Sequence, residues 1–308
     1  MDLRVTPLSR QLGAVVEGID FAQPVGAAER ERLISLWHQH GLLLIRGSSV
    51  SPESQIAFSR IFGELEEHPL KTLRAGRYPE LMELNSEDAK TNPLAYWDGE
   101  AVIGRLPWHK DLIYTAKPNH GAILRAVRIP ATDGETGYGD QRCAYDALSD
   151  EWKARIADLE VVYRFGVILR DMRFIDTAGY VPGPDVPKST QDLGFADFPD
   201  SLHPLVLEHP ITGDRSLNIS PMFLERVHGM APEESDALLR ELVAHVTRPE
   251  FCYLHTWTPG EMILWDNWRF MHSAPGIKPG DRRVIHRTTI LGDAKFGRVV
   301  ILKRQGRH

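Results

Sequence analysis

Two segments near the N-terminus have the spacing of apolar side chains that is typical of amphipathic helices. Residues 27–41 carry apolar side chains three and four positions apart and end at Gly41, a favourable residue for a helix C-terminus. Residues 51–63 begin with Ser51 in the N-cap position, followed by a proline in the first turn. The pattern predicts two helices, separated by an apolar run over residues 42–47.

From about residue 81 the pattern changes to short apolar runs bounded by Gly, Pro, Asp or Asn, which are typical of strands. These runs cover residues 80–85, 120–129, 159–165, 203–210, 251–257, 261–267 and 282–290. Two further helices are expected at residues 149–159 and 231–246, each opened by a capping residue or a proline. Many strands with few helices predict a mainly β fold, a jelly-roll type barrel with added helices.

Residues 170–201 are rich in Pro, Gly and Asp and have weak periodicity. Unstructured loops of this length are uncommon inside compact domains unless they are functional, so an active-site loop or lid is expected here. The chain of 308 residues is compatible with a single domain, because β barrels often reach this size undivided.

Composition and charge exclude several classes of partner. The formal net charge is −6 with acidic and basic residues interleaved, so the chain offers no basic stripe for nucleic acid. The sequence has no leader-like N-terminus and no apolar run approaching the roughly 18 residues of a membrane span. Cys143 and Cys252 lie far apart without a CxxC pair, which favours a reducing compartment, and we expect a cytoplasmic protein with two inert thiols.

The stretch WHKD places His109 and Asp111 two positions apart in a predicted strand. Side chains two apart point to the same face of a strand, so the imidazole and the carboxylate would project side by side, away from Lys110. Two histidines and one carboxylate bind Fe(II) on one side and leave positions open for a co-substrate and dioxygen. The pair alone also fits an ordinary polar pair on a sheet surface, and a metal site needs a second histidine.

The C-terminal segment supplies a candidate histidine and a candidate cation. His272 follows a predicted strand and turn, and Arg287 lies on the next predicted strand. A dicarboxylate that chelates iron through its oxo-acid end leaves its far carboxylate in need of a cation, and a guanidinium can bind it with two parallel hydrogen bonds. Strand alternation places Arg283 on the same face as Arg287, as a candidate second contact. Each arginine taken alone fits a solvated strand edge equally well.

The order of these residues resembles that of the taurine and 2,4-dichlorophenoxyacetate dioxygenase family of Fe(II)- and 2-oxoglutarate-dependent oxygenases. The likeness runs over nearly the whole chain in five ordered motifs, WHKD, GETGYGDQRCAYDAL, HPLVLEHPITGDRSL, WDNWRFMHSAP and RRVIHRTTI. An ordered set of this kind is much more specific than any one motif.

The resemblance implies a set of site residues, a fold and a reaction. The implied iron ligands are His109, Asp111 and His272, and the implied contacts to 2-oxoglutarate are Thr136, Arg287 and, more weakly, Arg283. The implied fold is a double-stranded β-helix (jelly-roll) core in one domain, residues 1–308. The expected reaction uses dioxygen to hydroxylate a small organic substrate and releases succinate and CO2, while the protein supplies ligand geometry, charge and exclusion of water.

Departures from the taurine enzymes concern the substrate. His68 matches a histidine that family members place near the anionic end of the substrate. Lys71, Arg105 and Asn218 stand where the taurine enzymes have an aromatic hydroxyl, an amide and a phenylalanine. Extra cations can pair with a carboxylate, sulfonate, sulfate or phosphonate, so we expect a small anionic substrate other than taurine. The structural alternative is that these residues are ordinary surface groups.

Two alternative functions remain open on the sequence. The same iron triad also serves desaturation or cyclisation in biosynthetic pathways, and the fold also serves non-catalytic ligand-binding proteins. The complete set of implied ligands, together with Arg287, argues against a non-catalytic protein. Asp111 argues against halogenation, which in related iron enzymes needs this carboxylate to be missing. The family commonly forms dimers or tetramers, so a homo-oligomer is expected.

Overall fold

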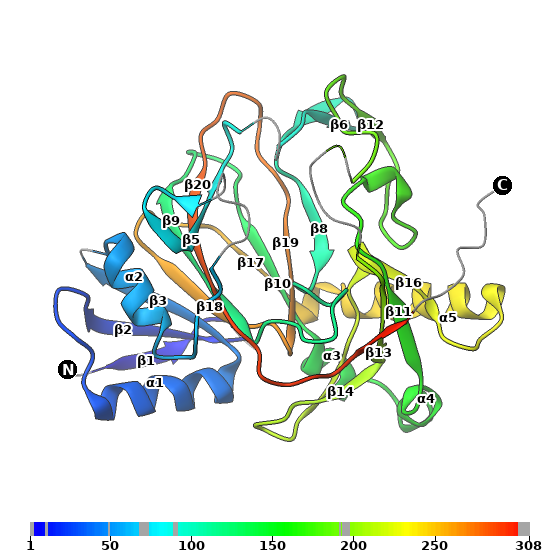
Figure 1. Ribbon diagram of the computed structural model, residues 1–308, viewed down its shortest axis with the longest axis horizontal. Helices are drawn as coiled ribbons and strands as arrows, with labels where there is room; N and C mark the ends of the chain where they lie inside the picture. The colour runs from blue at the N-terminus through cyan, green and yellow to red at the C-terminus, as the bar shows by residue number, and fades with distance from the viewer. Residues whose placement is uncertain are drawn as a thin grey trace.

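The computed structural model describes residues 3–9, 12–48, 50–67, 74–88, 92–190, 192 and 198–300. Most of the regular secondary structure is β-strand, and the helices lie on the outside of the molecule (Figure 1). The fold is therefore mainly β with added helices, as the sequence pattern predicts. Within the described ranges, no helix is long and apolar enough to cross a membrane.

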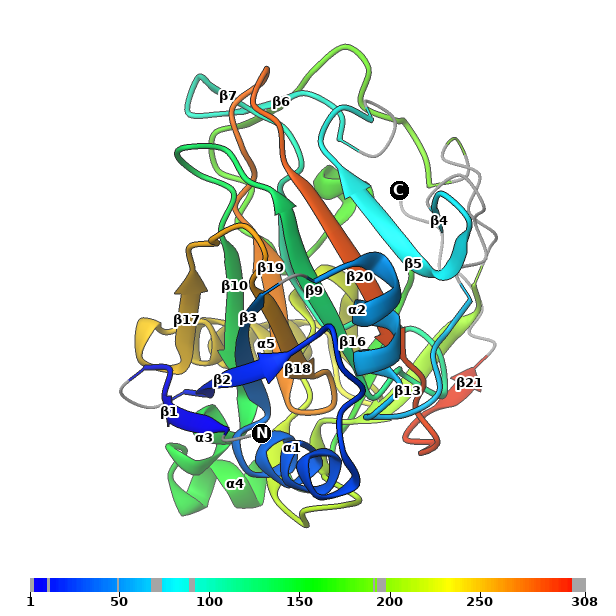
Figure 2. The same ribbon diagram turned by 90° about the vertical axis from the view of Figure 1, so that its left-hand side faces the viewer.

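An eight-stranded sheet forms the larger part of the core. Its strands, in spatial order, are β1 (Arg4–Pro7), β2 (Ala14–Asp20), β3 (Leu42–Ser48), β18 (Met262–Asp266), β9 (Gly121–Arg128), β20 (Val284–Ile290), β5 (Tyr78–Asn85) and β4 (Arg74–Ala75). Neighbouring strands are antiparallel except β2 and β3, which are parallel and joined through helix α1 (Ala27–His40). The long strands β5, β20 and β9 run side by side in Figure 2.

Both faces of this sheet are buried, which explains its continuous apolar runs. On β3, Leu43 and Ile45 pack in one cluster with Trp37 of α1. Leu42 and Leu44, on the opposite face, pack in another cluster with side chains of the second sheet. Helix α2 (Pro52–Ser59) packs against β20, β5 and β9, and its Phe58 belongs to the same cluster as Trp37. Its N-cap is Ser51, whose side chain accepts from the backbone of Ser54 in a capping box.

The second sheet has four antiparallel strands and packs against the inner face of the first. Its spatial order is β17 (Cys252–His255), β10 (Thr136–Asp140), β19 (Phe270–Ala274) and β8 (Leu106–His109). Tyr138 of β10 and Phe270 of β19 are fully buried in the same cluster as Trp265 of the large sheet. Strands from the middle and from the C-terminal third of the chain thus meet in this small sheet.

A further group of elements surrounds a third hydrophobic cluster. They are the sheet of β16 (Leu224–Val227), β11 (Glu160–Tyr163), β13 (Asp200–Pro204) and β21 (Arg298–Val300), the hairpin of β14 (Val206–Glu208) and β15 (Arg215–Leu217), the helices α3 (Gln141–Asp146), α4 (Asp150–Ile156) and α5 (Pro232–Val246), and the 3-10 turns at Leu169–Asp171, Pro221–Phe223 and Pro249–Phe251. Helix α5 packs with Leu238, Leu239 and Leu242 against this cluster. Their spacing is that of an amphipathic helix.

Part of the segment expected to be an active-site loop has regular structure. Residues Tyr180–Pro182 form strand β12, which pairs with β6 (Ala95–Trp97), and β6 pairs with β7 (Glu100–Val102). This three-stranded sheet lies at one end of the molecule in both views (Figures 1 and 2). Strand pairing between β6 and β12 therefore joins the segment that precedes His109 to the segment that follows Arg170.

Candidate functional site

Strand pairing brings together two histidines that are far apart in the sequence. His109 at the end of β8 lies directly across from His272 on β19. Their ring centroids are 4.0 Å apart, and both residues are buried. Cross-strand partners on one face lie close enough for their side chains to touch. The register of β8 against β19 therefore sets the distance between the two imidazoles.

Asp111 completes a cluster of three potential metal ligands. Its Oδ1 lies 3.6 Å from Nε2 of His109, and its Oδ2 lies 3.7 Å from Nε2 of His272. The ligand atoms of all three residues lie within 4.8 Å of one another. Nδ1 of His109 donates to the carbonyl oxygen of Pro107 at 2.8 Å, so the lone pair of the neutral ring is on Nε2, facing the cluster.

Strand alternation does not position Asp111, contrary to the sequence-based expectation. Strand β8 ends at His109, and Asp111 lies in the turn that follows, where Leu112 has a φ of +53°. The side chain of Asn267 holds this turn: its Oδ1 accepts from Asp111 N at 2.9 Å, and its Nδ2 donates to Asp111 O at 3.0 Å. The same Nδ2 lies 3.1 Å from the carbonyl oxygen of Asn119. A side chain from the distant WDN motif therefore takes the place of a strand partner.

Arg287 neutralises the carboxylate of this cluster. Its Nη2 lies 2.6 Å from Oδ2 of Asp111, and its guanidinium lies over the ring of Trp265. Burial by itself would raise the pKa of Asp111, but Arg287 and the histidines hold it well below its usual range. Burial, together with the neighbouring His109, also lowers the pKa of His272 well below its usual range. The result is one ionised carboxylate beside a neutral His272 imidazole, a donor set suited to a divalent metal.

Thr136 and Arg283 lie next to each other, as expected for two groups that contact one ligand. Nη2 of Arg283 donates to Oγ1 of Thr136 at 3.1 Å, and its Nε donates to Gly134 O at 2.9 Å. Nε1 of Trp257 donates to the same Thr136 oxygen at 2.9 Å. Burial lowers the pKa of Arg283 to about 10. Arg283 immediately precedes β20 of the eight-stranded sheet, which carries Arg287, whereas Thr136 begins β10 of the four-stranded sheet, so this contact joins the two sheets.

The four residues expected to contact substrate differ in where the structure places them. His68 and Lys71 lie outside the described residues. Arg105 is exposed, and its guanidinium carbon lies 4.3 Å from the ring centroid of Trp97 in the β6–β7–β12 sheet. Asn218 is buried, and both ends of its amide bond protein groups: Oδ1 accepts from Lys110 and Nδ2 donates to Pro204 O. These contacts give Asn218 a packing role, and its contact with substrate stays a prediction.

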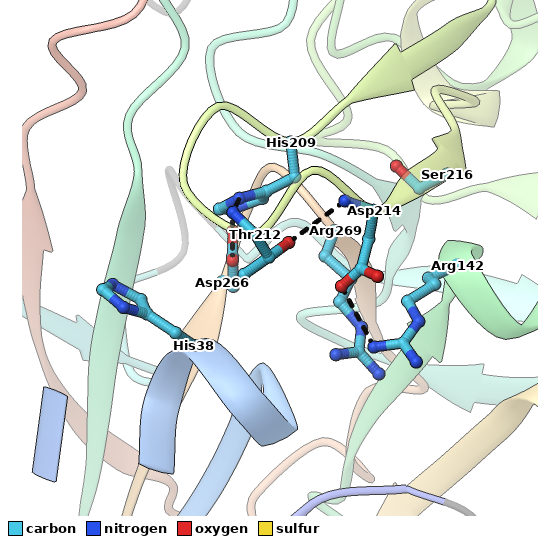
Figure 3. A pocket seen from close by; sticks show the side chains of 8 residues that line it. All are labelled: His38, Arg142, His209, Thr212, Asp214, Ser216, Asp266 and Arg269. Atoms are coloured by element: carbon cyan, nitrogen blue, oxygen red, sulfur yellow. Dashed lines mark hydrogen bonds and ion pairs between the residues drawn. The ribbon is translucent and has the colours of Figure 1, made fainter. Parts of the chain in front are cut away.

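A second cluster, formed by His120, His209 and Asp266, also has ligand atoms within 4.8 Å of one another. Figure 3 shows two of its members, His209 and Asp266, in a small pocket. The backbone N–H groups of Ile211 and Thr212 both donate to Nδ1 of His209 at 3.2 Å. The ring proton must then be on Nε2, which donates to Asp266 Oδ2 at 2.9 Å. This cluster offers a metal no free lone pair on His209, in contrast to His109 in the first cluster.

Comparison with known proteins gives a consistent result over the whole chain. A family model described as Taurine catabolism dioxygenase TauD, TfdA family matches residues 4–289. The chain is 30% identical over 289 residues to (S)-phenoxypropionate/alpha-ketoglutarate-dioxygenase of Sphingobium herbicidovorans, covering 94% of this chain and 95% of that protein. It is 30% identical over 313 residues to pentalenolactone F synthase of Streptomyces arenae, covering 96% and 97%. The crystal structure of a taurine dioxygenase from Burkholderia xenovorans matches with a TM-score of 0.74 and 27% identity, covering 98% of this chain and 97% of that chain.

Proposed function

This chain belongs to the taurine catabolism dioxygenase TauD, TfdA family, and from that premise we propose that it is an Fe(II)- and 2-oxoglutarate-dependent dioxygenase that hydroxylates a small anionic substrate. The convergence of His109, Asp111 and His272, with Arg287 beside them, is the observation that carries the proposal. Two imidazoles and one carboxylate are the ligand set that binds Fe(II) and leaves one side open.

Each residue has a role that follows from its position. His109 and His272 would bind Fe(II) through Nε2, and Asp111 through its carboxylate. Bound there, iron would supply the redox chemistry that couples dioxygen to decarboxylation of 2-oxoglutarate. Arg287, Thr136 and Arg283 would hold the carboxylates of 2-oxoglutarate, because a guanidinium pairs with a carboxylate through two parallel hydrogen bonds.

We infer that the two packed sheets that enclose this site are the halves of a double-stranded β-helix. The eight-stranded and four-stranded sheets pack face to face through a shared apolar cluster. His272 packs against Trp265 of that cluster, His109 is buried as well, and the Asp111 side chain is only 13% exposed, an environment that would limit the access of water to the reaction. Succinate and CO2 would leave as co-products.

The substrate class is argued from charge and from a relative. Arg105 is an exposed cation over Trp97, on the sheet formed by the segments before β8 and after Arg170. The (S)-phenoxypropionate dioxygenase of S. herbicidovorans is named for an aryloxy carboxylate. We propose that residues 170–201 and the β6–β7 hairpin border the substrate, with Arg105 near its anionic end. His68 and Lys71 remain candidates for the same role.

A biosynthetic oxidase is the second candidate function. Pentalenolactone F synthase of S. arenae is as similar to this chain as the phenoxypropionate enzyme, at 30% identity in each case. The same ligand set serves either reaction, so desaturation or cyclisation in a biosynthetic pathway is the alternative to hydroxylation.

The test is an anaerobic titration followed by a substrate screen. Fe(II) and 2-oxoglutarate should produce a weak visible charge-transfer band in wild-type protein, and His109→Ala should abolish it. Aryloxy carboxylates, sulfonates, sulfate esters and larger cyclic acids are then screened for dioxygen-dependent succinate formation, and the products show hydroxylation or desaturation. Arg105→Met should raise KM for the active acid and leave the band unchanged. Absence of the band in wild-type protein would refute the proposal in favour of a non-catalytic protein.

A further inference from the structure

Lys110 lies between His109 and Asp111, and its side chain runs into the protein interior. Only 1% of this residue is exposed. Its Nζ donates to Oδ1 of Asn218 at 2.7 Å and to the backbone carbonyl oxygen of Trp268 at 2.8 Å. Lysine is almost never fully buried unless its amino group is paired, because desolvation of that group is costly.

The two acceptors belong to different segments. Asn218 follows β15, and its Nδ2 donates to Pro204 O at 3.1 Å, so the amide is fixed from its other side as well. Trp268 lies in the turn between β18 and β19, four residues before His272. The amino group of Lys110 therefore links the backbone of residues 109–111 to the turn that leads to the third residue of the cluster.

Hydrogen bonds, and not strand pairing, determine the path of the chain at this point. β8 ends at His109. Beyond it, the N–H of Lys110 donates to Oγ of Ser220 at 2.9 Å, and the N–H of Asp111 donates to Oδ1 of Asn267. The side chain of Lys110 adds two further contacts, to Asn218 and Trp268, which are not members of the candidate metal cluster. The direction of the Asp111 carboxylate thus depends on groups that lie outside the cluster.

Stability alone does not explain a lysine at this position. An apolar side chain of similar length would fill the same space without a buried amino group, and such replacements are often neutral or stabilising when both partners are changed. We propose that Lys110 is a positioning residue, whose hydrogen bonds to Asn218 and Trp268 orient the 109–111 backbone so that His109 and Asp111 face one metal ion. This inference rests on the proposed iron site.

The test uses Co(II) alone as the probe, so that the readout does not depend on turnover. Lys110→Met removes the donor at nearly constant volume, and Lys110→Met/Asn218→Leu leaves neither side chain of that hydrogen bond unpaired. Lys117→Met, at an exposed position on the same segment, is the matched control. Loss of a group that orients metal ligands typically lowers metal affinity roughly 10- to 100-fold, and we expect that loss in Lys110→Met, with a shifted visible Co(II) spectrum. The control should match wild type.

The double variant separates positioning from stability. We expect it to regain part of the thermal midpoint that Lys110→Met loses, because the Asn218 oxygen is no longer left unpaired, although the carbonyl oxygens of Trp268 and Pro204 still lack these donors. We do not expect it to regain the Co(II) affinity of wild type. Wild-type Co(II) affinity and spectrum in either folded variant overturn the proposal. If neither folds, Asn218→Leu, which keeps Lys110 and removes one acceptor, is measured in the same way, with the same two outcomes. Failure of the iron site itself has a different signature, because His109→Ala would then bind Co(II) as wild type does.

Discussion

Nη2 of Arg287 lies 2.6 Å from Oδ2 of Asp111, so the arginine assigned to 2-oxoglutarate also contacts a residue assigned to iron. Both side chains are largely buried, at 13% exposed each. A pair of this kind is costly to break by removing one partner, because the other charge is left desolvated. We therefore expect that a change to either residue affects the binding of both the metal and the dicarboxylate.

Replacement of Arg287 should weaken binding of 2-oxoglutarate far more than loss of an ordinary surface charge. Each charge-assisted hydrogen bond contributes about 1.5–3 kcal/mol, so Arg287→Met should raise the dissociation constant roughly 10- to 150-fold for each such bond that is lost. The dissociation constant of Arg287→Lys should lie between those of wild type and Arg287→Met, because lysine keeps the charge and loses the two parallel hydrogen bonds. Calorimetric titration of 2-oxoglutarate into the Co(II)-loaded protein measures this. Arg282→Met, at an exposed position next to Glu87, is the control, and equal affinities in the two methionine variants would disprove the assignment.

Metal binding at the three-residue cluster should stabilise the folded protein. A ligand at 100 times its dissociation constant adds about 2.7 kcal/mol to the free energy of unfolding. Co(II) should therefore raise the thermal midpoint of wild type, and a chelator should reverse the rise. Neither His109→Ala nor Asp111→Ala should respond, whereas the surface variant His228→Ala should respond as wild type does. A response in Asp111→Ala would place the metal elsewhere.

Removal of the Asn267 side chain should destabilise the turn that carries Asp111. Its amide bonds both backbone groups of Asp111 and the carbonyl oxygen of Asn119. Buried groups left without partners cost about 1–3 kcal/mol each, so Asn267→Ala should lower the free energy of unfolding by roughly 3 kcal/mol and weaken Co(II) binding as well. Chemical denaturation measures the first effect. Asn85→Ala, at a partly buried position with local contacts only, should cost less than about 1 kcal/mol, and equal losses would contradict the role of Asn267.

Acid should destabilise the protein through His120. This imidazole is stacked on Trp268 at a centroid distance of 3.8 Å and packs against Trp37, whose ring is tilted, at 4.3 Å. Burial lowers the pKa of His120 to about 4 even though Asp266 is nearby. Above its ordinary pKa of about 6.5 the ring is neutral in both states. Below that value the unfolded chain binds a proton that the folded protein does not bind. The free energy of unfolding therefore decreases as the pH is lowered to about 4.

The expected loss from this one histidine is about 3 kcal/mol between pH 6.5 and 4. His120→Phe keeps the aromatic contact with the two indoles and removes the titration. Denaturation midpoints measured across this pH range should therefore fall less steeply in the variant. Parallel curves for the two proteins would show that His120 is not responsible.

The sequence identifies the three candidate iron ligands, but it does not explain how all of them are positioned. The HxD stretch and His272 are found by residue type and order, and the structure brings all three together. The reason offered for Asp111 was wrong, because β8 stops one residue after Trp108 and the turn is held by Asn267. Strand periodicity is a local property, whereas the amide that fixes this turn comes from 156 residues further along the chain.

The segments and residues proposed to border the substrate also depend on contacts that are distant in the sequence and that local patterns do not reveal. Strand β12 inside residues 170–201 has no strong strand signal of its own and forms by pairing with Ala95–Trp97. The sequence predicts Asn218 as a substrate contact, but its partner Lys110 lies 108 residues away in the sequence and is brought to it only by the fold. The cytoplasmic location and the dimeric or tetrameric state stay predictions.

The direct opposition of His109 and His272 across β8 and β19 has a consequence for how such a protein can diversify. Insertion or deletion of one residue in either strand would turn an imidazole to the opposite face, since successive side chains alternate. Length changes in the β6–β7 hairpin or in the segment around β12 leave that register untouched. On the proposal that these peripheral segments border the substrate, we expect their exchange between homologues to alter the substrate range while the spacing of the two imidazoles is kept.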